Sequence, residues 1–326
     1  MSFLINSMIG IKFISAQPDV PYFHWQCEIY GHNYVRMGVD PKNIVMLFGT
    51  QGDEPSEGLK KLSEKYDVYY YKDTRNRKYY PPSLKPHLIW KFLKDNPTDK
   101  FFLHDSDILF RKLPDFDKLT DDKIYLSDTK SYIGYQYLLD CCNRYKEKFP
   151  QTHDRELIRW MMDEVGISIE TIIDKDFNAG GAQYLFKDQD WKVWKKIERD
   201  AQAIYDKMTM YQKVYPLSNN PVQFWTAEMW AVLWNMWFFD YQTQITKELD
   251  FSWASDNRQL YMQKNIFHCA GVTKETKEGR FYKGDFIEIN PLDLLKEDSN
   301  YFDYVSTNSA SFFYVQEMKD LVRKME

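Results

Sequence analysis

The first 104 residues alternate between short apolar runs and stretches with helical spacing of apolar residues. This alternation constrains the fold more than any other feature. The predicted strands lie at residues 9–15, 43–48, 67–71 and 100–104, and the predicted helices between them lie at 22–37, 55–65 and 82–95. Strands and helices that alternate through short connections predict a mostly parallel central sheet flanked by helices. We therefore expect an α/β fold.

The rest of the chain predicts additions to that sheet. Residues 115–174 are mixed and mostly helical, and residues 177–187 form an apolar run with a double glycine. Further helices are expected at 191–208, 225–239 and 312–325, and short strands are expected within 251–272. We expect helical insertions and a C-terminal helix around one core, without an interdomain linker.

Composition excludes several classes of protein. The formal net charge of −5 argues against a strongly basic nucleic-acid-binding surface, although residues 72–78 (KDTRNRK) form one local basic stretch. The four cysteines match no zinc-site spacing and suit a reducing compartment. No signal peptide is evident at the N-terminus, and no apolar run reaches the roughly 18 residues of a membrane span. These features predict a cytoplasmic protein without a membrane partner.

The segment FFLHDSDILFR, residues 101–111, is the strongest chemical signal. An apolar strand delivers Asp105 and Asp107 to the carboxyl end of the sheet, where ligands bind in α/β folds. Two carboxylates separated by one small residue, Ser106, are able to hold one Mn²⁺ or Mg²⁺ that also binds a diphosphate. A solvated pair of loop carboxylates is the alternative interpretation.

Four weaker signals accompany this segment, and each also has a structural interpretation. Asn178 and the double glycine Gly180–Gly181 suit close approach to a ligand, or a tight turn. His268 ends a short apolar run and suits a third metal ligand. Lys283 suits contact with a diphosphate. Glu228 stands in an otherwise apolar helix, where a carboxylate is costly unless it is paired or functional.

Taken together, these motifs resemble nucleotide-sugar glycosyltransferases of the GT-A fold. They are most similar to the hydroxyproline O-arabinosyltransferases and peptidyl-serine α-galactosyltransferases. The resemblance runs in order through YFHWQ (22–26), LKPHLIWKFL (84–93), HDSDILFRKLP (104–114), NAGG (178–181), FKDQDWKVW (186–194), TAEMWA (226–231), FHCAG (267–271) and RFYKGDF (280–286).

The resemblance implies a Rossmann-like nucleotide-binding part at about residues 1–115 and a sugar and acceptor part at about 116–326, within one domain. It also implies a UDP-sugar donor, a Mn²⁺-type ion and retention of anomeric configuration. By this resemblance Asp105, Asp107 and His268 bind the metal, and Glu228 and Asn178 act in catalysis. The implied donor-binding residues are Gln26, Lys85, Ser106, Gly180, Gly181 and Lys283.

The sequence departs from that family in lacking a membrane anchor and a disulfide framework, so the acceptor is left open. The acceptor hydroxyl can belong to a protein, a glycan or a hydroxymethylated DNA base. For a DNA acceptor, the expected contact surface is residues 72–78 with Tyr79 and Tyr80. Two other functions also compete. One is a phosphatase of the haloacid dehalogenase type, which places its Asp pair after the first strand. The other is a non-catalytic sugar-binding protein.

Overall fold

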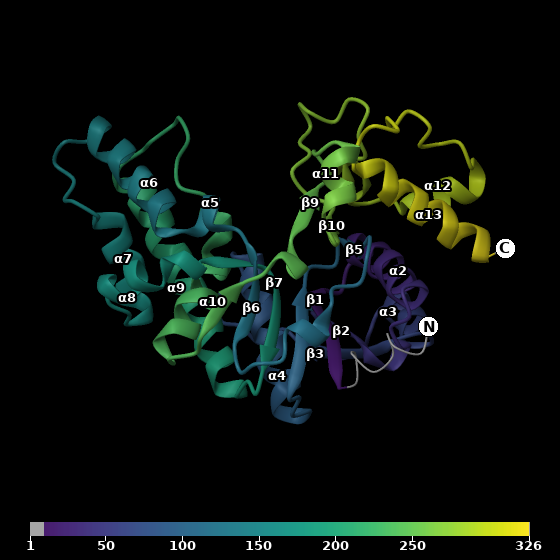
Figure 1. Cartoon of the computed structure of the whole chain (residues 1–326), viewed down its shortest axis with the longest axis horizontal. Coiled ribbons are helices and arrows are strands. Elements are labelled where there is room, and N and C mark those ends of the chain that lie inside the picture. Colours follow the sequence, from purple (N-terminus) through teal and green to yellow (C-terminus); the bar gives the residue numbers. More distant parts are fainter. Residues whose placement is uncertain (1–9, 326) are drawn as a thin grey trace. The chain divides into compact units, whose positions relative to one another are not determined.

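The computed structural model describes residues 10–325, and it divides into two compact units (Figure 1). Unit 1 contains the N-terminal region up to Lys72, Phe101–Thr120 and the C-terminal region from Glu248. Unit 2 contains Asp73–Lys100 and Asp121–Lys247. The C-terminal region therefore belongs to the same compact unit as the N-terminal strands. The expected absence of a signal peptide concerns the N-terminus, of which residues 1–9 lie outside the described part.

Unit 1 is built on strands that follow the predicted order. β1 (Ile11–Pro18), β2 (Ile44–Thr50) and β3 (Asp67–Lys72) pair in parallel, and with β4 (Lys100–His104) they run in the order β3-β2-β1-β4. Every residue of β2 is buried, which explains its continuous apolar run. Helices α2 (Pro21–Arg36), α3 (Glu57–Ser63), α12 (Pro291–Glu297) and α13 (Ser311–Met325) also belong to unit 1, and α13 contacts α2.

A second, three-stranded sheet lies in unit 1, with the strand order β5-β10-β9. β5 (Ile108–Phe110) follows the Asp pair directly and pairs antiparallel with β10 (Ile266–His268). β9 (Phe251–Trp253) pairs in parallel with β10. A short helix, α11 (Arg258–Gln263), which the sequence reading missed, separates these two strands. This sheet brings residues 108 and 268 opposite each other.

The core of unit 1 is aromatic where the two sheets meet helix α2. The ring of Phe13 on β1 makes edge contacts with Tyr34 and Phe110, and also with Phe102 and Phe116. All of these side chains are buried, and each such pair contributes about 1 kcal/mol beyond its buried area. These aromatic side chains therefore form part of the core of unit 1.

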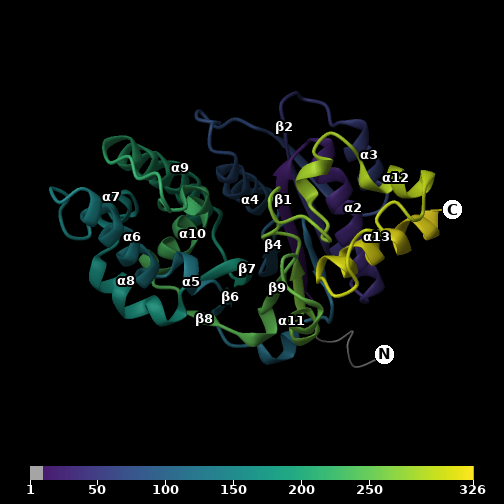
Figure 2. The same cartoon turned by 90° about the horizontal axis from the view of Figure 1, so that it is seen from above.

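Unit 2 is mostly helical and packs around three strands. β7 (Gly180–Lys187), β6 (Ile124–Asp128) and β8 (Thr243–Ile245) run in that order, with β7 antiparallel and β8 parallel to β6. The helices are α4 (Leu84–Asp95), α5 (Lys130–Ile133), α6 (Tyr135–Lys148), α7 (Glu156–Val165), α8 (Ile169–Lys175), α9 (Trp191–Val214) and α10 (Ala227–Phe238). Figure 2 shows α7, α9 and α10 together, and each of them contacts the other two.

Two helices of unit 2 match the sequence pattern closely. Helix α9 begins after Asp190, whose side chain accepts a hydrogen bond from the Lys192 amide at 2.8 Å. It continues six residues beyond the predicted end, to Val214, because Tyr211 extends its buried stripe. Helix α10 is buried almost all round, as its apolar composition predicted.

These observations confirm the expected α/β fold with a mostly parallel sheet, flanking helices, helical insertions and a C-terminal helix. Short 3-10 turns complete the structure at residues Pro41–Asn43, Pro81–Ser83, Phe116–Lys118, Asp176–Asn178, Phe224–Thr226, Lys247–Leu249 and Lys283–Phe286. Within residues 10–325, no helix combines the length and the apolar character that crossing a bilayer requires.

Candidate functional site

Three predicted metal ligands come together at the carboxyl end of β4. Asp105 and Asp107 follow that strand, and the pairing of β10 with β5 sets His268 opposite Ile108. The Nε2 atom of His268 lies 3.3 Å from Oδ1 of Asp107 and 3.8 Å from Oδ2 of Asp105. One ligand atom from each residue lies within 4.8 Å of the others. A single ion can therefore be reached by two carboxylates and one imidazole.

The imidazole of His268 is held in place by packing. Trp253 on β9 stacks on its ring, with centroids 5.2 Å apart and planes 24° apart. The Nδ1 atom of His268 is buried and accepts or donates no hydrogen bond among the described residues. The polar contacts of the ring are thus made through Nε2, on the side of the two carboxylates. A metal ligated by Nε2 fits this arrangement.

Lys283 lies beside the same pair of carboxylates. Its ammonium forms an ion pair with Oδ2 of Asp107, while His268 faces the other oxygen. Burial by itself raises the pKa of Asp107, but the charges of Lys283 and His268 outweigh burial and hold that pKa well below its usual range. Asp107 is therefore an anion at neutral pH, although only 3% of its surface is exposed.

The loop that carries Lys283 is anchored to helix α2. The indole nitrogen of Trp25 donates to the carbonyl of Phe286 at 3.2 Å, and the rings of Phe281 and Phe286 stack. The Cys269 amide donates to the Asp107 carbonyl at 2.8 Å, which ties the end of β10 to the loop of the Asp pair. The lysine is thus positioned by buried contacts on both sides of its turn.

Two predicted donor-binding residues, Gln26 and Ser106, bind each other. The Ser106 hydroxyl donates to Oε1 of Gln26 at 3.0 Å, and Nε2 of Gln26 donates to the Tyr22 carbonyl at 2.8 Å. Both side chains are buried. In this structure they connect the loop of the Asp pair to the first turn of α2, which sets the direction of Asp105 and Asp107.

Sequence reasoning missed the residues that fix β5. The side-chain amide of Asn33 on α2 binds both the N–H of Phe110, at 2.8 Å, and its carbonyl, at 3.2 Å. Asn33 also donates to Glu317 on α13, which binds Arg36 in turn. No pattern in the sequence distinguishes Asn33 from the other polar residues of this helix. Glu317 also lies close to His32 and Asp320, and these three residues form a second group of possible metal ligands. Because Glu317 already binds Asn33 and Arg36, we interpret this group as structural.

The remaining predicted residues lie in unit 2, and two of them form a pair. The ammonium of Lys85, near the start of α4, lies 3.5 Å from a carboxylate oxygen of Glu228 on α10. Glu228 is buried, with 3% of its surface exposed. Its amide donates to the hydroxyl of Tyr80 at 2.8 Å. The buried carboxylate thus has a cationic partner, as its burial requires.

Asn178 and the double glycine have local structural contacts. Oδ1 of Asn178 accepts a hydrogen bond from the Ile245 amide at 3.3 Å, at the start of β7 and the end of β8. A Cβ added to Gly180 would lie 2.4 Å from the Ser127 carbonyl, and one added to Gly181 would lie 2.9 Å from Met229 on α10. Gly180 is therefore required by the close approach of the β6 backbone, whereas the atoms nearest Gly181 belong to the side chains of Tyr184 and Met229.

The cations of the basic stretch at residues 72–78 have acidic or carbonyl partners in the structure, and contact with DNA stays a prediction. Arg75 is 9% exposed, because its guanidinium binds both carboxylate oxygens of Asp73 at 3.0 Å. Arg77 forms an ion pair with Asp206 at 2.5 Å. Lys78 donates to the Asp73 carbonyl at 2.9 Å. Asp73 lies within the stretch itself, whereas Asp206 is 129 residues away from Arg77 and cannot be recognised as its partner from the sequence.

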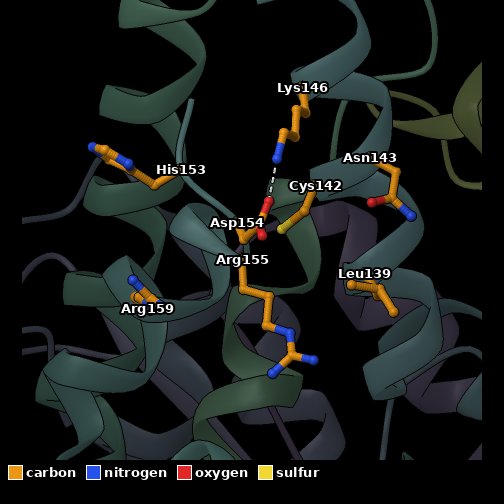
Figure 3. A pocket seen from close by; sticks show the side chains of 8 residues that line it. All are labelled: Leu139, Cys142, Asn143, Lys146, His153, Asp154, Arg155 and Arg159. Atoms are coloured by element: carbon orange, nitrogen blue, oxygen red, sulfur yellow. Dashed lines mark hydrogen bonds and ion pairs between the residues drawn. The ribbon is translucent and has the colours of Figure 1, made fainter. Parts of the chain in front are cut away.

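Unit 2 has a hollow between α6 and the start of α7, with a volume of about 380 Å³ (Figure 3). Lys146, Arg155 and Arg159 make its lining basic. Figure 3 shows the Lys146 ammonium turned toward Asp154, with which it forms an ion pair. The Arg155 guanidinium extends away from this ion pair. The cations do not converge on one point, so this hollow is a weaker candidate than the site of Asp105, Asp107 and His268.

Comparison with known proteins identifies no family. No protein-family model and no curated protein matches this chain. Among solved structures, the chain is similar to the apo structure of the bifunctional glycosyltransferase WbbM, with 10% sequence identity and a TM-score of 0.43. The alignment covers 94% of this chain and 51% of that one, so this chain spans about half the length of WbbM. The function proposed below therefore depends on the residues of this chain.

Proposed function

We propose that this protein is a metal-dependent glycosyltransferase that transfers a sugar from a UDP-sugar to a hydroxyl acceptor. The observation that carries the proposal is the cluster of Asp105, Asp107 and His268 at the carboxyl end of β4. Two carboxylates and an imidazole suit Mn²⁺, a cation that accepts both oxygen and nitrogen ligands. When bound, such an ion neutralises the charge that a diphosphate leaving group develops.

Lys283 has a matching role in this proposal. Its ammonium already lies in an ion pair with Asp107, so it is placed to contribute positive charge beside the diphosphate. A fixed cation at the position where negative charge develops lowers the barrier to transfer. Trp25 and Cys269 hold the surrounding loops and keep the lysine in this place.

Bond making and breaking in the proposed reaction balance without a further reactant. The bond between the anomeric carbon and the diphosphate oxygen breaks, and its electron pair leaves with UDP. The acceptor oxygen forms the new bond to that carbon, and its proton passes to a diphosphate oxygen. In line with the resemblance, we propose that the sugar keeps its anomeric configuration. Glu228 and Lys85 form their ion pair within unit 2, and a role for Glu228 toward the sugar or the acceptor stays a prediction from the resemblance.

A donor assay tests this function. UDP-pentoses and UDP-hexoses are incubated with the protein and Mn²⁺, and UDP release is measured. We expect release from at least one donor, and loss of release in Asp107→Asn. Asp117→Asn, which alters an exposed carboxylate of unit 1, is the control and should keep full activity. Release of phosphate from aryl phosphates, without UDP release from any donor, would contradict the proposal and favour the phosphatase.

A further inference from the structure

Trp225 differs from the other tryptophans in being exposed. It has 58% of its surface accessible, whereas the other nine of the ten are buried or half-buried, and all ten lie in the described part of the chain. Trp225 stands in the 3-10 turn Phe224–Thr226, directly before α10 and three residues before Glu228. An indole ring offers a flat apolar face to a ligand and a polar N–H at its edge.

The turn that carries Trp225 is held by several hydrogen bonds. The Tyr80 hydroxyl donates to the Trp225 carbonyl at 2.9 Å and accepts from the Glu228 amide at 2.8 Å. The Thr226 hydroxyl donates to the Gln223 carbonyl at 2.6 Å. One buried phenol therefore fixes the backbone at both Trp225 and Glu228. A ligand that stacks on the ring does not have to order this turn first, which favours binding.

Tyr80 is itself anchored. Its ring stacks on Tyr205 of α9, with centroids 4.3 Å apart, and its carbonyl accepts a hydrogen bond from Arg75. Arg75 is in turn held by Asp73. The chain of contacts from Asp73 to Trp225 lies within unit 2. The exposed ring and the buried carboxylate thus have a rigid common support.

The charges of this part of unit 2 indicate an uncharged ligand. Arg75 pairs with Asp73, Arg77 with Asp206, and Lys85 with Glu228. Because each of these three cations has an acidic partner, the three pairs carry no net charge and add little to the positive field that draws a phosphate backbone to a protein. A stacking surface beside neutralised charges suits a neutral sugar, whose C–H face packs on an aromatic ring while its hydroxyls bind polar groups.

We infer that Trp225 is the platform on which a neutral sugar ring of the acceptor stacks, with Tyr80 holding it in a fixed relation to Glu228. Only the description of this sugar as the acceptor rests on the proposed function, because binding of a sugar to Trp225 is measurable without transfer. It selects a carbohydrate among the acceptors that the sequence leaves open. Tyr80 acts as a positioning residue, since it binds backbone atoms rather than the sugar.

Acrylamide quenching of tryptophan fluorescence, compared between wild type and Trp225→Phe, tests the inference directly, because the difference isolates Trp225, the most exposed of the ten tryptophans. The probes are methyl glycosides of neutral pentoses and hexoses, neutral oligosaccharides, and a single-stranded DNA oligonucleotide. We expect at least one neutral sugar to protect the quenchable fraction of fluorescence and the oligonucleotide to give no protection. Protection by the oligonucleotide alone, or by none of the probes, would overturn the inference.

Variants separate stacking from a structural effect. Trp225→Ala should weaken binding of the best sugar, measured by saturation-transfer NMR, by about tenfold or more, as loss of a central aromatic contact does. Trp225→Phe should retain part of the affinity. Phe239→Ala, at the other end of α10 and 41% exposed, is the matched control and should bind like wild type. Equal affinity of Trp225→Ala and wild type would overturn the inference.

The outcome is separable from that of the proposed function. In transfer assays with the best sugar as acceptor, Trp225→Ala should raise the acceptor KM about tenfold and leave the donor KM unchanged. Sugar binding at Trp225 without UDP release from any donor would keep this platform and reject the transferase. UDP release with unchanged acceptor KM in Trp225→Ala would keep the transferase and reject the platform.

Discussion

At the scale of single residues, the proposed chemistry centres on the carboxylate of Asp107, which has two neighbouring groups. One carboxylate oxygen faces His268 and the other faces Lys283. In the proposed function, a metal ion and the lysine would share this one anion. Asp107 would bind the ion, and it also positions Lys283, which would stabilise the leaving group. A change of Lys283 separates these two functions of Asp107.

Lys283→Gln should change metal binding and activity in opposite directions. Removal of the ammonium frees one oxygen of Asp107, so we expect tighter Mn²⁺ binding by calorimetry. Loss of positive charge beside the diphosphate should lower kcat by about 100-fold, as for other preorganised electrostatic groups. Lys277→Gln, which removes an exposed lysine paired with Asp285, is the control. Weaker Mn²⁺ binding in Lys283→Gln would show that the lysine supports the metal site instead of competing with it.

Asp73→Asn should destabilise the protein in a pH-dependent manner. Burial alone raises the pKa of Asp73, but the bonds and charge of Arg75 lower it below the ordinary value of 3.8. A carboxyl whose folded pKa is lowered stabilises the fold above its unfolded pKa, and this contribution is lost as pH falls through the folded value. At pH 7 we expect a loss of about 3 kcal/mol, because Arg75 stays buried without its partner.

Urea denaturation of Asp73→Asn and wild type at pH 7 and near pH 3 measures this difference. The gap in the free energy of unfolding should narrow at the lower pH. Asp53→Asn, which breaks an exposed pair with Lys72, should cost less than about 1 kcal/mol at either pH. A gap for Asp73→Asn that stays constant between the two pH values would contradict an ionic origin.

At the scale of elements, strand pairing decides where chemistry is possible. β5 is only three residues long, yet its antiparallel pairing with β10 brings His268 beside Asp107, 161 residues earlier in the chain. Asn33 closes the other edge of β5 by binding both backbone polar groups of Phe110. In unit 2, β6 and β7 shift register between Leu126 and Ser127. Gly180 on β7 allows the two backbones to approach closely at this point.

Gly180→Ala tests this packing of β6 on β7. The added Cβ would lie 2.4 Å from the Ser127 carbonyl and 2.9 Å from Leu126, so a strand has to move. We expect a loss of about 1–3 kcal/mol in the free energy of unfolding, typical of overpacking. Gly52→Ala, where a Cβ meets only one atom at 4.0 Å, should lie within about 0.5 kcal/mol of wild type. Thermal and urea unfolding measure both.

At the scale of the whole molecule, the two units are interleaved along the chain. The backbone passes between them after Lys72, Lys100, Thr120 and Lys247. Unit 1 therefore receives β4 and the Asp pair from the middle of the sequence, and β10 and Lys283 from its C-terminal part. A metal ion bound by Asp105, Asp107 and His268 would connect two of these separate segments, so metal binding should stabilise the folded chain.

Mn²⁺ should accordingly raise resistance to unfolding. At a concentration 100 times its Kd, a ligand that binds only the folded protein adds about 2.7 kcal/mol to the free energy of unfolding. We expect a rise in Tm with Mn²⁺ that EDTA reverses, and no rise in His268→Ala. His153→Ala, which removes an exposed histidine of unit 2, should respond like wild type. An equal rise in His268→Ala would place the ion elsewhere.

Local pattern determined much of this protein. The period of apolar residues predicted the strands of the parallel sheet and helices α2, α4, α9 and α10, because side-chain spacing reflects which face is buried. It also predicted that Asp105 and Asp107 lie at the end of β4, since a strand end is a local feature. His268 and Lys283 were named from local motifs and resemblance, and the structure brings both to Asp107.

Only the tertiary structure decided which charged and polar side chains meet. The pairing of Lys85 with Glu228, of Arg77 with Asp206, and of Gln26 with Ser106 joins residues that are distant in sequence. Burial changes what a charge does, because a cation with an acidic partner no longer attracts phosphate from solvent. Neither the partner nor the burial leaves a periodic signal in the sequence, and for that reason the stretch at 72–78 reads as a run of free cations although the folded chain pairs Arg75 with Asp73 and Arg77 with Asp206.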